Sequence, residues 1–202
     1  MPKQYDLILC DLGNVVVKFD HRILARKISR LSGRSTEELY DLFFDSALTR
    51  LHDEGKITSR EFHERVNNLL GIHTSFDFFK KCWNHIFFTN PGMARIIKDI
   101  RRQHMVYLMS NTNRLHFEYI RERFSVINSF DHLVLSYKVG AMKPDKIIYR
   151  YALRRAGVSA ARTLYIDDRA DLIEGGRKLG ITGVVFCDPQ QLRHDLRKKG
   201  VL

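Results

Sequence analysis

The segment LILCDLGNVVV, residues 7–17, decides the fold of this chain. A continuous apolar run ends abruptly at Asp11, and Gly13 and Asn14 follow before the apolar residues resume. An unbroken apolar run of this length is typical of a strand buried on both faces of a parallel sheet. The segment therefore predicts a first strand at 6–10 that carries one carboxylate to the edge of a sheet.

Four later segments repeat the short, unbroken apolar pattern and lie at residues 105–109, 132–135, 163–166 and 182–186. Helical patterns separate them. One begins at Pro91, a second begins at Pro144 and ends at Gly157, and a third ends at Gly180. Strands that alternate with helices predict an α/β fold, a doubly wound, Rossmann-like parallel sheet with helices on both faces.

Residues 20–90 are too many for a single crossover between the first two strands. They contain at least four helical patterns and no clear strand. Ser35 with Glu38 and Thr58 with Glu61 have the spacing of capping boxes, and Gly71 is placed to end the helix that Thr58 begins. We therefore expect a core domain from residues 1–19 and 91–202, with a helical insert at 20–90.

The bulk composition narrows the classes of protein. At 202 residues and 44% hydrophobic, the chain is large enough for one substantial core. No apolar run approaches 18 residues, the N-terminus has no signal-peptide pattern, and three widely spaced cysteines argue against a disulfide framework. These features predict a cytoplasmic protein without a membrane partner.

The formal net charge is +11, which attracts anions such as phosphorylated metabolites or nucleic acid. The basic runs lack the interleaved aromatic residues of a single-strand binder, so solvated helix faces are the preferred interpretation. We expect a small phosphorylated metabolite as the partner, no nucleic acid, and a monomer or weak homodimer.

Polar residues follow the predicted strands where a parallel sheet binds its ligands. They are Asp11, Ser110 and Asn111, Lys143, and the acidic group Asp167, Asp168 and Asp171. Clustered carboxylates suit Mg²⁺, and a carboxylate can itself attack phosphorus. A lysine and a hydroxyl can hold the transferred group and offset its charge. Asp171 alone is as readily explained as a residue at the start of a helix.

Four segments carry a resemblance to a known family. They are DLGNV with Asp11, SNT with Ser110, KPD with Lys143, and DDRADLIEG with the acidic group. Their order and placement over residues 6–186 resemble the haloacid dehalogenase (HAD) superfamily, and the insert looks like its C1-type cap. DLGNV, SNTNRLH and KPDKIIY are most similar to the bacterial sugar-phosphate phosphatases that include α-glucose-1-phosphate phosphatases.

The resemblance implies a Mg²⁺-dependent phosphatase that hydrolyses small phosphate monoesters, such as sugar phosphates, through a phospho-aspartyl intermediate on Asp11. Mg²⁺ would be held by Asp11, the carbonyl of Gly13 and Asp168, with Asp167 helping directly or through a bound water. Ser110 and the Asn111 amide would hold phosphoryl oxygens, and Lys143 would neutralise charge on nucleophile and phosphate.

Gly13 departs from the pattern of the superfamily. Most of its phosphatases carry a second aspartate at this position, which acts as general acid and base. Two alternatives therefore stay open: a catalytically weak phosphate-binding or regulatory protein, and a metal-independent 2-haloacid dehalogenase. The dehalogenases carry a bulky residue at this position, so Gly13 favours phosphate chemistry.

Residues of the cap and of the segment after the second motif are candidates for contacts to the leaving group. We expect Arg114 to bind substrate, and His52, Glu54 and His116 are further candidates to face it.

Overall fold

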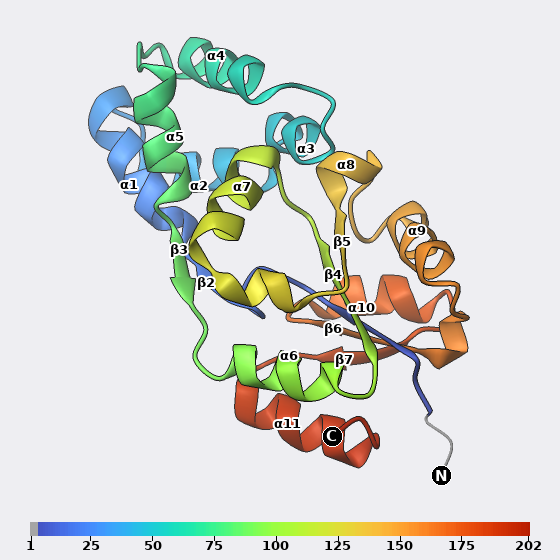
Figure 1. Ribbon diagram of the computed structural model, residues 1–202. Coiled ribbons are helices and arrows are strands. Elements are labelled where there is room, and N and C mark those ends of the chain that lie inside the picture. The colour runs from blue at the N-terminus through green and yellow to red at the C-terminus, as the bar shows by residue number, and fades with distance from the viewer. Residues whose placement is uncertain (1–3) are drawn as a thin grey trace.

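The computed structural model describes residues 4–202 and contains a five-stranded parallel sheet with the order β5-β4-β1-β6-β7 (Figure 1). The strands are β1 (Leu7–Cys10), β4 (Met105–Ser110), β5 (His132–Leu135), β6 (Thr163–Asp167) and β7 (Thr182–Val185). All five coincide with predicted strands to within a residue or two. The central strand β1 pairs with β4 on one side and β6 on the other. The order in which strands are added therefore reverses at β1, the strand that leads to Asp11, and doubly wound sheets bind ligands at such a point.

Helices cover both faces of the sheet. They are α6 (Met93–Arg101), α7 (Arg114–Arg123), α8 (Ser136–Val139), α9 (Lys146–Ala156), α10 (Ala170–Arg177) and α11 (Pro189–Lys198), with short 3₁₀ turns at Ser125–Ser129 and Ala160–Arg162. Alternate residues of β1 face opposite layers, as strand geometry requires. Ile8 and Cys10 pack in the cluster that contains α6, α7 and α11, whereas Leu7 and Leu9 pack in the cluster with α9 and α10.

Between β1 and α6 the chain forms five helices that share a second hydrophobic cluster (Figure 1). They are α1 (His21–Ser32), α2 (Thr36–Asp45), α3 (Ala47–Asp53), α4 (Ser59–Leu70) and α5 (Phe76–Asn84). Both predicted capping boxes are present, and Gly71 ends α4 in the left-handed conformation. Trp83 is fully buried in the centre of this cluster, with Phe43, Phe62 and Phe79 around it.

A two-stranded antiparallel ribbon joins this insert to the sheet domain. It consists of β2 (Val17–Phe19) and β3 (Phe87–Thr89). The expectation of no strand within residues 20–90 is therefore wrong for β3. Three residues are too few to show a period, and their pairing partner lies about seventy residues away in sequence. Strand β2 lies in the predicted core segment and β3 in the predicted insert, and the domain boundaries at residues 20 and 90 stay a prediction.

Three helix ends differ from the predicted ones. Helix α6 begins at Met93 because Gly92, in the left-handed conformation, precedes it, so Pro91 lies outside the helix. Helix α9 begins at Lys146, where the Asp145 side chain accepts a hydrogen bond from the Ile147 amide. Helix α10 ends at Arg177, and Gly180 closes a following turn.

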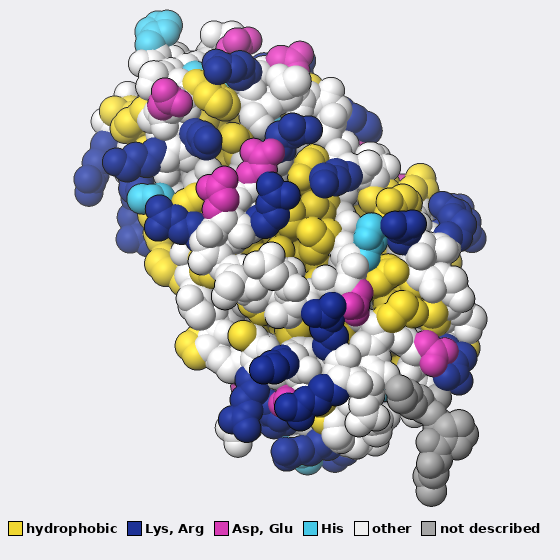
Figure 2. All heavy atoms as spheres, viewed as in Figure 1, with side chains coloured by type: hydrophobic (Ala, Val, Ile, Leu, Met, Phe, Trp, Pro, Cys, Tyr) yellow, Lys and Arg dark blue, Asp and Glu magenta, His cyan; other side chains and the backbone are white. Residues whose placement is uncertain are grey.

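The positive charge is spread over helix faces. Lys and Arg side chains cover much of the face in Figure 2 and gather over α6 and α11. The three cysteines are free, with Cys10 and Cys82 buried. Within residues 4–202, the structure has no helix with the length and apolar character needed to cross a bilayer.

Candidate active site

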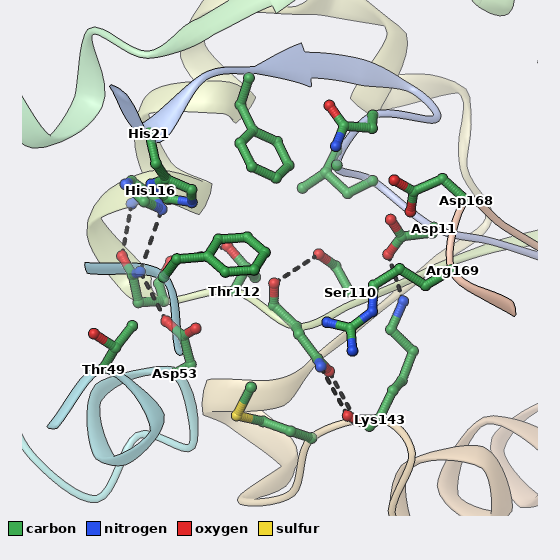
Figure 3. A pocket seen from close by; sticks show the side chains of 18 of the residues that line it. Asp11, His21, Thr49, Asp53, Ser110, Thr112, His116, Lys143, Asp168 and Arg169 are labelled. Atoms are coloured by element: carbon green, nitrogen blue, oxygen red, sulfur yellow. Dashed lines mark hydrogen bonds and ion pairs between the residues drawn. The ribbon is translucent and has the colours of Figure 1, made fainter. Parts of the chain in front are cut away.

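The carboxyl ends of the central strands bring the predicted polar residues together. Asp11 follows β1, Ser110 ends β4, Asp167 ends β6, and Lys143 lies in the segment between α8 and α9. Asp11, Ser110, Lys143 and Asp168 lie at one end of a shared cavity (Figure 3). Four segments distant in sequence thus meet at one edge of the sheet, as the motif order predicts.

Lys143 is the centre of this arrangement. Its ammonium group donates to Asp11 Oδ1 at 2.5 Å, to Asp167 Oδ2 at 2.7 Å and to the carbonyl of Met109 at 3.1 Å. All three of its protons are therefore used, and the side chain is 1% exposed. Burial lowers the pKa of Lys143, but the charges of Asp11 and Asp167 outweigh burial and raise it, so the group stays cationic.

The backbone of Lys143 is fixed by Asn111. Asn111 Nδ2 donates to the backbone carbonyl of Lys143 at 2.9 Å, and the backbone N–H of Lys143 donates to Asn111 Oδ1 at 2.7 Å. This reciprocal pair ties the segment after β4 to the lysine segment. The Asn111 side chain is therefore engaged in positioning Lys143.

Asp167 has no exposed surface and its oxygens are already occupied. In addition to the contact from Lys143, Oδ2 accepts from the Tyr165 hydroxyl, and Oδ1 accepts from the Arg169 amide at 2.9 Å. One oxygen from each of Asp11, Asp167 and Asp168 nevertheless lies within 4.8 Å of the other two. This all-oxygen donor set fits Mg²⁺, with Asp11 and Asp168 as the carboxylates less occupied by the protein.

The carboxyl group of Asp11 is shielded from water. Burial raises its pKa to about 7; Lys143 opposes this effect, and Asp167 and Asp168 add to it. A divalent cation at the same oxygens would favour the ionised form, because opposite charge lowers a carboxyl pKa.

The space beside Gly13 is filled by Phe19. A Cβ atom added to Gly13 would lie 2.6 Å from Phe19 Cε1, closer than real contacts allow. Phe19 belongs to β2 of the ribbon and also lines the cavity. The position of the missing aspartate is thus occupied by an aromatic ring.

The cavity has a volume of about 270 Å³ and two chemically different ends. One end holds Asp11, Lys143 and Asp168, and the other, beneath the helical insert, holds His21, Thr49, Asp53 and His116 (Figure 3). Aromatic residues line the walls: Phe19, Phe43, Phe44, Trp83 and Phe87. This volume is near the lower limit for ligand sites, which suits a small metabolite.

Asn113 organises the second end. Its Oδ1 accepts from Trp83 Nε1 at 3.3 Å and from the His116 amide at 3.0 Å, and its Nδ2 donates to Asp53 Oδ1 at 2.9 Å. His116 stacks on Trp83 and hydrogen-bonds the Trp83 carbonyl at 3.1 Å. Burial lowers the pKa of His116, so its ring is neutral. This network joins α7 of the core to α3 and α5 of the insert.

Two titratable groups at this end have displaced pKa values. Burial raises the pKa of Asp53 to about 7, Glu54 adds to this, and the hydrogen bond from Asn113 opposes it. Burial also lowers the pKa of His21 to about 4, against the opposing charge of Asp20. His21 is therefore neutral at pH 7.

The other candidates from the sequence lie in different places. His116 lines the cavity, but Arg114 and His52 line a second hollow with Arg60 and Tyr137. The structure therefore places Arg114, the exposed first residue of α7, in this second hollow and not in the Asp11 cavity. Glu54 pairs with Arg50 and Lys56. Asp171 forms an exposed pair with Arg169.

Sequence reasoning missed Asp53, His21, Thr49 and Phe19 as cavity residues. Asp53 lies between His52 and Glu54, both of which were candidates. The signal that could have found it is its position at the end of α3, two residues before Gly55, whose positive φ of 69° turns the chain. Which of three adjacent polar residues faces inward depends on how α3 is rotated over the core.

A doubly wound sheet with an acidic centre at its carboxyl edge and a helical insert above it defines a class of α/β enzymes. Within that class, a family model for haloacid dehalogenase-like hydrolases matches residues 5–180, and the chain belongs to this family. It is accordingly a hydrolase.

Individual relatives cover nearly the whole chain. A D-ribitol-5-phosphate phosphatase of Bacteroides thetaiotaomicron is 26% identical over 86% of this chain and 87% of its own length. A HAD family enzyme from the same organism, solved with magnesium and inorganic phosphate, superposes with a TM-score of 0.85 at 22% identity, over 96% of this chain and 100% of its own.

An L-2-haloacid dehalogenase from Xanthobacter autotrophicus, solved with chloropropionic acid covalently bound, has a TM-score of 0.67 at 14% identity, over 98% of this chain and 84% of its own. The fold is therefore shared with both chemistries, and the residues of the site have to distinguish them.

Proposed function

We propose that the protein is a Mg²⁺-dependent phosphatase that hydrolyses small phosphate monoesters, sugar phosphates in particular, through a phospho-aspartyl intermediate on Asp11. The observation that carries the proposal is the cluster of Asp11, Asp167 and Asp168 around the buried ammonium of Lys143. Carboxylates alone would repel a phosphate. They fit a phosphate site when they hold a divalent cation, because the phosphate then binds through the metal.

In the first step the phosphoryl group is transferred to Asp11, and each residue of the site has its own role. A carboxylate oxygen of Asp11 attacks phosphorus in line, the P–O bond to the leaving group breaks, and an acyl phosphate forms on Asp11. The Ser110 hydroxyl and the backbone amide of Asn111 hold phosphoryl oxygens. Lys143 holds Asp11 in one orientation, and its charge offsets that of nucleophile and phosphoryl group.

The second step returns the enzyme to its starting state. Water attacks phosphorus and releases a proton to solvent, the bond to the Asp11 oxygen breaks, and inorganic phosphate leaves. Asp11, the carbonyl of Gly13 and Asp168 would hold Mg²⁺, with Asp167 acting through Lys143 or a bound water. The bound cation stabilises negative charge on the phosphoryl oxygens.

The proton for the leaving group does not come from residue 13. We propose that solvent supplies it, so that turnover favours leaving groups that depart with little help, such as the anomeric oxygen of a sugar 1-phosphate. The relative that acts on ribitol 5-phosphate supports a phosphorylated sugar or polyol as substrate. We also propose that the protein acts in the cytoplasm as a monomer or weak homodimer.

The experiment is a panel of phosphorylated sugars, polyols and p-nitrophenyl phosphate, assayed for phosphate release with Mg²⁺ and with excess chelator. We expect release from several members, abolished by chelator. No release from any member would refute the proposal. Release of halide from a 2-haloacid in the presence of chelator would assign the chain to the dehalogenases instead.

A further inference from the structure

The second end of the cavity lies beyond any bound phosphoryl group. A phosphate held between Asp11, Ser110 and Lys143 directs its leaving group along the cavity, toward the helical insert (Figure 3). The part of the substrate farthest from phosphorus therefore meets Asp53, His21 and Thr49. Their chemistry selects the leaving group.

Asp53 has one oxygen available for a ligand. Its Oδ1 accepts from Asn113 Nδ2 at 2.9 Å, and no hydrogen bond to Oδ2 exists within residues 4–202. Within the same range, Asp11, Asp167 and Asp168 are the other carboxylates of the cavity wall, and all belong to the phosphate end. Asp53 is thus the carboxylate that a substrate hydroxyl can reach at the cap end.

The Asp53 carboxylate is held in a fixed direction. Asn113 cannot rotate away, because its oxygen already accepts from Trp83 and from the His116 amide. The backbone carbonyl of Asp53 accepts from the Ser136 hydroxyl at 2.6 Å, which ties the end of α3 to the core. Because the carboxylate is already fixed, little conformational entropy is lost when a ligand binds to it.

His21 supplies an independent indication of a ligand at the same end. Its Nδ1 is buried and has no hydrogen-bond partner within the described part of the chain. Phe19 and Phe44 pack edge-on against its ring. A buried polar atom without a partner is costly, and a substrate hydroxyl that pairs with it removes this cost.

We propose that Asp53 and His21 form a subsite that binds a hydroxyl group of the substrate distant from its phosphate. The inference rests on the proposed function and narrows it to phosphorylated polyols and sugars. The aromatic walls cover the carbon chain, and the volume of about 270 Å³ suits a substrate of this size.

The test compares two esters of equal chain length, ribitol 5-phosphate and n-pentyl phosphate, as a ratio of kcat/KM. We expect wild type to prefer the polyol. Asp53→Asn retains an oxygen that accepts from Asn113 but loses the charged acceptor, and we expect it to reduce the ratio about 10- to 100-fold. His21→Phe should reduce the ratio about 3- to 10-fold.

Asp41→Asn, at an exposed aspartate of α2, is the matched control and should keep the wild-type ratio. If Asp53→Asn lowers kcat/KM equally for both esters, or for neither, the subsite proposal is refuted. A purely structural role of Asp53 would change kcat/KM for both esters by the same factor. A wild type that prefers n-pentyl or an isoprenoid phosphate would overturn it in favour of an apolar leaving group. If wild type hydrolyses neither these esters nor p-nitrophenyl phosphate, the proposed function itself fails.

Discussion

At the scale of single residues, Gly13 and Phe19 determine how the leaving group departs. A positioned general acid is worth about 10²–10⁴-fold, and this chain has a phenyl ring where a side chain at residue 13 would begin. We expect kcat/KM of wild type to fall steeply across phosphate esters as the leaving group becomes more basic. Gly13→Asp combined with Phe19→Ala should raise the rate on the poorest leaving groups by about 10-fold or more.

Gly13→Asp alone is the companion variant for this prediction. Its side chain must displace the Phe19 ring, so we expect less gain than in the double variant. A wild-type rate that does not depend on leaving-group acidity would show that another donor already protonates the leaving group.

Asp53 gives a prediction about pH and stability. Its pKa is about 7 in the folded protein, against an ordinary value of 3.8, so the folded state binds the proton more tightly than the unfolded state. Stability from this group is therefore complete below pH 4 and is lost as pH rises to 7. We measure the free energy of unfolding in urea without metal. The value for Asp53→Asn minus the value for wild type should increase by on the order of 1 kcal/mol from pH 5 to pH 8, because only wild type loses stability from this group. The same difference at both pH values would contradict this.

The residues that chemistry requires at strand ends were predictable, and those that shape the leaving-group pocket were not. Asp11, Ser110, Asp167 and Asp168 each stand at or directly after the end of a strand, and Lys143 follows β5 after one short helix, so the topology of the sheet brings them together. Asp53, His21 and Phe19 come from the insert and its ribbon. Their direction depends on how helices pack in three dimensions, and for the same reason the sequence did not indicate that Arg114 lines a different hollow.

At the scale of elements, the turn after α3 fits closely against α8. A Cβ added to Gly55 would collide with the carbonyl oxygen of Tyr137, whereas one added to Gly33, after α1, would meet open space. Both glycines have a positive φ, 69° and 68°, so alanine strains both backbones by about 1 kcal/mol. We expect only Gly55→Ala also to shift α3 and Asp53, and to reduce kcat/KM at least 10-fold more than Gly33→Ala.

We measure kcat/KM of Gly55→Ala and Gly33→Ala with the best substrate of the panel. Urea unfolding of both variants shows whether a lower kcat/KM comes only from lower stability. Equal kinetic effects of the two substitutions would mean that the contact between insert and core does not position the site.

The hydrophobic pattern of the sequence predicted whether a segment is a helix or a strand more reliably than it predicted where that helix or strand begins and ends. The capping boxes of α2 and α4 were readable because side chain and backbone are three residues apart. The ribbon was not, because β2 and β3 are only three residues long and pair across the whole insert.

At the scale of the whole molecule, metal binding should be visible as stability. Asp11, Asp167 and Asp168 are offset by one lysine, so the cluster repels itself without a cation. Mg²⁺ at 100 times its Kd stabilises the folded state by about 2.7 kcal/mol, and each kcal/mol shifts Tm by about 2–4 °C for a chain of this size. We expect thermal unfolding to show this shift for wild type.

Asp168→Asn should remove most of the Mg²⁺-dependent shift and raise Tm in the absence of metal, because it relieves repulsion. Asp41→Asn should behave as wild type. A shift that survives in Asp168→Asn would place the cation elsewhere.

The most direct test of the central claim is the initial rate of phosphate release from p-nitrophenyl phosphate with Mg²⁺, for wild type and for Asp11→Asn. The substitution keeps the size of the side chain and removes the nucleophilic carboxylate. We expect release by wild type and a rate for Asp11→Asn that does not exceed the enzyme-free blank. Release by Asp11→Asn at the wild-type rate would contradict it.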